Sequence, residues 1–125
     1  MIELGLLYFY LLSYKLDNLG KFKYIPIDMN VDLDNVYMID FPSISSYSFL
    51  ITYAYGHPNF PNELSNCITN LKVGFDFIHT PLLLIVASEI TSVLRVQFRP
   101  WDNKISVGPW SPNDKGFLKG ILLIN

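Results

Sequence analysis

The stretch "YIPIDMNVDLDN", residues 24–35, alternates apolar and polar side chains and is the strongest local indicator of how the chain folds. Apolar residues take every second position from Ile27 to Leu33, and acidic or amide residues take the positions from Asp28 to Asp34. Successive side chains of a β-strand point to opposite faces, so this period of two predicts a half-buried strand over residues 27–34. Pro26 lacks a backbone N–H, which suits the first residue of a strand or a strand at a sheet edge.

Further strands are expected along the rest of the chain. Runs rich in β-branched and aromatic residues indicate strands at 36–41, 46–56, 72–79 and 104–108. Residues 82–99 allow two interpretations. Thr80 and Pro81 would suit the start of a helix, whereas the many β-branched residues favour two strands, 82–87 and 92–99.

Three segments favour helices. Residues 3–18 are apolar nearly all round and stop before Gly20, which predicts a buried N-terminal helix, with a pair of strands as the alternative. Residues 61–71 allow one or two helical turns. Ser111 with Asp114 three residues later resembles a capping box and predicts a short C-terminal helix, with a strand over the last residues as the alternative. The expected fold is therefore α+β, an antiparallel sheet of about five or six strands with helices on one face, in a single domain over residues 1–125.

The composition argues for a packed core and against several classes of protein. Half the residues are apolar, 15% are aromatic and only 16% are charged, which is the reverse of a disordered chain. The net charge of -2 offers no basic surface for nucleic acid. The apolar N-terminus lacks the basic start of a signal peptide and is too short for a membrane span. With Cys67 as the lone cysteine, no internal disulfide forms, and a cytoplasmic location is expected.

The acidic stretch resembles part of a calcium loop but lacks its essential residues. Asp28, Asn30 and Asp32 match the first three ligand positions of an EF-hand. Leu33 stands where that loop needs glycine, and Ile39 stands where it needs glutamate. A row of side chains on a strand spreads ligands out, so no metal site is expected.

Charge is unevenly distributed along the sequence. Between Lys23 and Lys72 there are five acidic residues and no Lys or Arg. The rest of the chain carries all nine basic residues against six acidic ones. Such segregation favours either a solvated strand or an acidic surface that meets a basic partner. The residues expected to bind that partner are Asp28, Asn30, Asp32, Asp34 and Asp40.

Two tryptophans are added to this set. Trp101 and Trp110 flank "DNKISVGP" and, together with Arg99 and Pro100, predict an aromatic, cationic hairpin. Tryptophan and arginine are common anchors of protein interfaces. Packing of both indoles in the core is the alternative.

No catalytic or cofactor-binding motif is present, and neither a cofactor nor an enzymatic activity is expected. His57 lies in a turn-like sequence, and Asp76 and His79 would face opposite sides of a strand. The small, acidic, aromatic-rich profile is typical of bacterial immunity and antitoxin proteins. We therefore expect a protein that neutralises a basic partner, such as a toxin nuclease domain, by covering its active surface. The alternatives are a small enzyme or ligand-binding domain with a pocket lined by Tyr47, Tyr53, Tyr55 and the histidines, and a structural homo-oligomer.

Overall fold

The structure, a computed structural model, describes residues 22–40, 42–72 and 78–125. These residues form eight strands and two short 3-10 segments, in the order β1 (Phe22–Val31), β2 (Tyr37–Asp40), η1 (Pro42–Ser46), β3 (Phe49–Tyr55), β4 (Ser65–Asn70), β5 (Ile78–Val86), β6 (Glu89–Arg99), η2 (Pro100–Asp102), β7 (Lys104–Pro109) and β8 (Gly116–Ile124).

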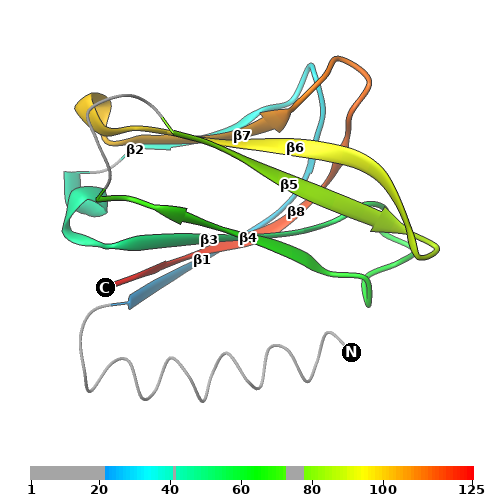
Figure 1. The fold of residues 1–125 in the computed structure, drawn as a ribbon, viewed down its shortest axis with the longest axis horizontal. Helices are drawn as coiled ribbons and strands as arrows, with labels where there is room; N and C mark the ends of the chain where they lie inside the picture. The colour runs from blue at the N-terminus through cyan, green and yellow to red at the C-terminus, as the bar shows by residue number, and fades with distance from the viewer. Residues whose placement is uncertain (1–21, 41, 73–77) are drawn as a thin grey trace.

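The strands make two four-stranded antiparallel sheets, in the orders β1-β8-β3-β4 and β2-β7-β6-β5. Figure 1 shows the two sheets as stacked layers, with β2, β7, β6 and β5 in one layer and β1, β8, β3 and β4 in the other. The chain crosses between the layers after β1, β2, β4 and β7. We call the surface of the β2-β7-β6-β5 sheet that points away from the other sheet the outer face.

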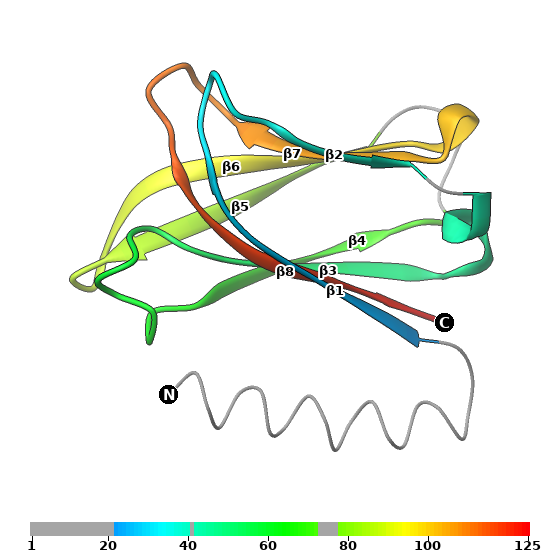
Figure 2. The same cartoon turned by 180° about the vertical axis from the view of Figure 1, so that it is seen from behind.

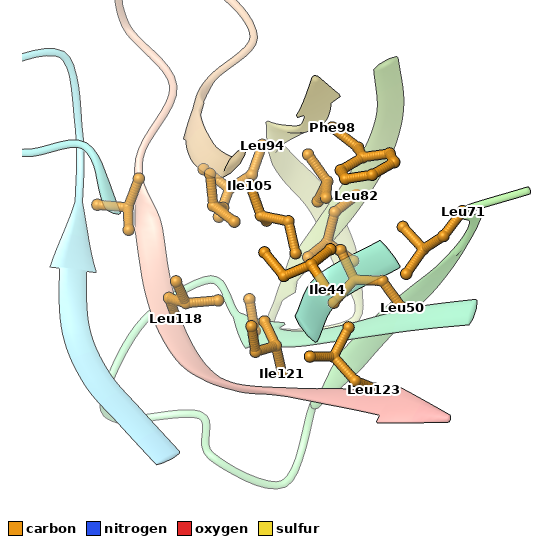
Figure 3. Packing of buried hydrophobic residues seen from close by; sticks show 14 of the residues in the cluster. Ile44, Leu50, Leu71, Leu82, Leu94, Phe98, Ile105, Leu118, Ile121 and Leu123 are labelled. Atoms are coloured by element: carbon orange, nitrogen blue, oxygen red, sulfur yellow. The ribbon is translucent and has the colours of Figure 1, made fainter. Parts of the chain in front are cut away.

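The core fills the space between the two sheets. Leu94, Val96 and Phe98 are the inward residues of β6, and they alternate with the less buried residues between them. Leu118, Ile121 and Leu123 approach them from β8 in the opposite sheet, and Figure 3 shows these side chains meeting between the layers. Burial of apolar area is the main stabilising contribution, about 25 cal/mol per Å² removed from water.

The expected α+β class is wrong, because the described residues form a β-sandwich whose only helical turns are η1 and η2. A second sheet, in place of helices, covers the apolar face of the first. The helix expected over residues 3–18 lies outside the described residues. The helical turns expected within residues 61–71 are also wrong, since β4 pairs with β3 from Ser65 to Asn70.

The expected C-terminal helix is a strand, β8, although the local interaction that suggested it is present. The Asp114 carboxylate accepts a hydrogen bond from the Ser111 backbone N–H at 2.8 Å, and the Asp114 N–H donates to the Ser111 carbonyl at 2.9 Å. These bonds close a turn. The chain then pairs with both β1 and β3, and Gly116 leaves no space for a side chain, because an added Cβ would clash with Leu84 Cδ1.

Two predictions made from the strand patterns are confirmed. Residues 82–99 form two strands, β5 and β6, which turn at Ala87 and Ser88, both with positive φ. Pro26 lies in an edge strand, since β1 has a partner on one side only. The strand expected at 72–79 begins, in the described residues, at Ile78.

We expect substitution of Phe98 by alanine to lower the free energy of unfolding by about 3–5 kcal/mol, because the phenyl ring is fully buried. The matched control is Gln97→Ala, on the outer face one residue away, which should cost less than about 0.5 kcal/mol. Chemical denaturation of both variants measures the difference. Equal losses would contradict the assignment of inward and outward positions on β6.

Candidate binding surface

The residues of the acidic stretch do not share one face. Asp28 and Asn30 lie on the exposed side of β1, whereas Asp40 lies on β2, which belongs to the other sheet. Asp32 and Asp34 lie in the turn that carries the chain from one sheet to the other. The strand expected over residues 27–34 therefore ends at Val31, and the acidic row is divided between two sheets and a turn.

Asp28 already has a basic partner. It occupies a bulge in β1, with a φ of 53°, and its carboxylate lies 2.8 Å from the ammonium of Lys119 on β8. The hydrogen bond from the Lys119 ammonium to the Asp28 carboxylate raises the pKa of Lys119. The segregation of charge along the sequence is thus partly cancelled in the fold.

Asp32 holds the turn together. Its side-chain oxygen accepts the Asp34 backbone N–H at 2.9 Å, and its backbone exchanges two 3.2 Å hydrogen bonds with Asn35. The Asn35 side-chain amide donates to the Asn30 carbonyl at 2.7 Å. These bonds leave Leu33 and Asp34 exposed at the tip of the turn.

The two tryptophans lie at opposite ends of β7, about 20 Å apart for a six-residue strand. Trp101 belongs to η2, where the Arg99 guanidinium lies 5.9 Å from its ring centroid and also pairs with Asp102 at 2.8 Å. Trp110 follows β7 at the other end, and its backbone N–H donates to the Val93 carbonyl at 3.0 Å. The expected aromatic, cationic hairpin exists around Trp101 and does not include Trp110.

Trp110 is the first residue of the β7–β8 connection, which runs beside the acidic turn. The β1–β2 connection and the β7–β8 connection both cross between the sheets. Strands β1 and β8 are neighbours in one sheet, and strands β2 and β7 are neighbours in the other. The two connections must therefore run side by side, and in Figures 1 and 2 they form the cyan and orange loops at the same end of the sandwich. The Asp114 carboxylate fixes the second loop by accepting the backbone N–H groups of Val93 and Ser111.

The outer face carries exposed apolar side chains that the sequence analysis did not select. The strand register places Trp110, Val93 and Leu83 in one row across three strands. Met38 lies on the outward side of β2 and is 58% exposed. The exposed large apolar residues of this face and of the turn beside it are Leu33, Val36, Met38, Leu83, Ile90 and Trp110.

These residues were missed because their apolar neighbours conceal the alternation. In "PLLLIV" the inward Leu82 and Leu84 cannot be distinguished by composition from the outward Leu83. A strand with apolar residues on both faces reads as a continuous apolar run. The pairing of β5 with β6, which places Leu83 opposite Val93, is what identifies the outward residues.

The side chains expected to line a pocket lie in different parts of the fold. Tyr47 belongs to the core, and Tyr55 stacks on Phe117 with ring centroids 4.8 Å apart. His57 is exposed in a loop, where its Nδ1 accepts the Asn59 backbone N–H, and His79 lies on β5. In the ranges 22–40, 42–72 and 78–125, no group of three His, Cys, Asp or Glu side chains could hold a metal ion.

Cys67 shows no sign of an activated nucleophile. Burial raises the pKa of its thiol to about 11. The thiolate is the reactive form of cysteine, and a raised pKa makes it rare near neutral pH.

Comparison of the chain with protein-family models, with curated proteins and with solved structures found no significant match. None of the described residues forms a helix long and apolar enough to cross a membrane.

Replacing Asp32 by alanine should lower the free energy of unfolding by about 1 kcal/mol, because the turn loses the hydrogen bond to the Asp34 N–H. Asp34→Ala should change it by less than about 0.5 kcal/mol, since that side chain is exposed. Thermal or chemical denaturation of the two variants measures both values. The reverse order would mean that Asp34, not Asp32, stabilises the turn.

Proposed function

We propose that the protein binds another protein through the outer face and the adjoining acidic turn, and that it acts by covering the partner's active surface, as immunity and antitoxin proteins do. The observation that carries the proposal is the gathering of exposed Val36, Met38, Leu83 and Trp110 on one face of a rigid sheet. Contiguous exposed apolar surface is commonly a site of protein association. Tryptophan and methionine are enriched in such interfaces.

A β-sandwich suits this role because its core holds the sheet in one shape. A preformed surface loses little conformational entropy on binding, so more of the contact energy appears as affinity. Trp110 is the expected central anchor, since buried tryptophans dominate the energetics of many interfaces.

We still prefer a basic partner, but fewer acidic residues are available to contact it than the sequence suggested. Asp34 is exposed in the turn before β2, and Asp40 is exposed at the end of β2 with Lys104 as its register partner. Both lie on the margin of the apolar surface. Charges at the rim of an interface mainly accelerate association and orient the partner. Asp28 is a weaker candidate for contact with the partner because it forms an ion pair with Lys119. The Asp32 carboxylate already accepts a hydrogen bond within the turn.

Met38→Asp should abolish capture of the partner from the native cell, because it places a charge within the apolar contact surface. Ile68→Asp is the matched control, since Ile68 is 60% exposed on β4 of the other sheet and Met38 is 58% exposed. Affinity purification with quantitative mass spectrometry should recover the same protein with the wild type and with Ile68→Asp, and that protein's activity should fall on addition of the wild type. Loss of capture with Ile68→Asp and retention with Met38→Asp would place the interface on the opposite sheet and overturn the proposal.

The charge of Asp34 at the rim of the interface leads to a separate prediction. Asp34→Asn should slow association with the captured partner by about threefold at low salt and reduce the dependence of the rate on salt. Asp28→Asn changes the net charge by the same amount at a position already paired with Lys119, and it should have a smaller effect. Stopped-flow or surface-based kinetics over a range of salt concentrations compares the two. Equal effects would assign steering to the net charge of the whole protein.

A further inference from the structure

Arg95 lies in the middle of the outer face. Its register partners are Gly108 on β7 and Pro81 on β5, and it alternates along β6 with the fully buried Leu94 and Val96. The next row toward the turn is apolar, formed by Trp110, Val93 and Leu83. The guanidinium therefore belongs to the apolar surface proposed above as the interface.

The other cations of this face have acidic neighbours, and Arg95 does not. Arg99 pairs with Asp102 at 2.8 Å, and Lys104 is the register partner of Asp40. Within the part of the chain that the structure describes, the Arg95 guanidinium takes part in neither an ion pair nor a hydrogen bond. A protein that covers the outer face would take this charge out of water, which is costly unless the partner supplies an anion.

Gly108 allows an apolar side chain to lie close to Arg95. Because glycine has no side chain, Val36 packs against Gly108, and an added Cβ would lie 3.3 Å from Val36 Cγ1. A group that binds the guanidinium would therefore have apolar side chains beside it. Water exclusion by those side chains strengthens the attraction between opposite charges.

The geometry points to a carboxylate of the bound protein partner as the group that Arg95 receives, and this inference rests on the proposed function. Arginine binds carboxylates through two parallel N–H···O bonds, which fixes the orientation as well as the energy of the contact. A phosphate is a poorer fit, because it carries more charge and the neighbouring cations Arg99 and Lys104 have acidic neighbours already. The contact would set the partner's register on the sheet, while Asp34 meets basic groups at the rim.

Two blocked tripeptides, acetyl-Leu-Glu-Leu-amide and acetyl-Leu-Gln-Leu-amide, test the inference as matched probes on the full chain. Nitrogen-15 NMR titration to about 10 mM, in the weak range expected for fragments, follows the Gly108 amide and the Arg95 side-chain N–H. We expect the Glu peptide to bind about tenfold more tightly than the Gln peptide, as suits a hydrogen bond to a charged group. Arg95→Met should remove this preference and Arg95→Lys should reduce it, whereas Arg99→Met should leave it unchanged.

Several outcomes would overturn the inference. Equal affinity for the two peptides would show an apolar surface without carboxylate recognition, which leaves the proposed function intact. A preference for Glu that survives Arg95→Met, or no shift with either peptide, would contradict a role for Arg95. Concentration-dependent shifts of Gly108 without peptide, lost in Arg95→Met, would identify a second copy of the chain as the occupant in place of a partner. A failure of the proposed function would be seen in a separate experiment. In that case Met38→Asp would not reduce capture of the partner.

Discussion

The apolar layer between the two sheets is the constraint on which the rest of the structure depends. Each sheet supplies one row of buried side chains per strand, such as Leu94, Val96 and Phe98 from β6, and the two sets meet in one cluster. Because a strand alternates its side chains, the inward set determines the outward set residue by residue. The position of Arg95, Leu83 and Met38 on the outer face is thus a consequence of core packing.

The same constraint explains what became of the acidic stretch. The chain must leave one sheet and enter the other between β1 and β2, and the acidic residues fall across that crossing. One carboxylate closes the turn, another pairs with a lysine from β8, and a third lies on the opposite sheet. Residues close in sequence were separated, and residues far apart, such as Asp34 and Trp110, belong to neighbouring connections.

Local sequence signals were informative wherever a local interaction controls the outcome. The interaction between Ser111 and Asp114 was read correctly as a side-chain to backbone contact, yet it closes a turn that leads into a strand. Hydrogen bonds from β8 to β1 and β3, and close packing at Gly116, outweigh the weak helical preference of that segment. Within residues 61–71, where a helix was expected, Ser65–Asn70 forms strand β4 for the same reason, since it pairs with β3 along its whole length. The assignment of one domain to residues 1–125 stays a prediction.

The sequence by itself indicated the period-two strand that begins at Ile27, allowed an edge position for Pro26 and favoured two strands over a helix within residues 82–99. It also showed that the calcium loop lacks its glycine and its glutamate. These follow from side-chain alternation, the missing N–H of proline and the absence of glycine and glutamate at fixed positions, all of which act locally. Only the tertiary structure decided that a second sheet covers the first, that Lys119 neutralises Asp28, and that Arg95 lies among apolar residues beside Gly108. Those facts depend on pairing between strands distant in sequence, and the energy of such pairing comes from packing and hydrogen bonds that no single segment contains.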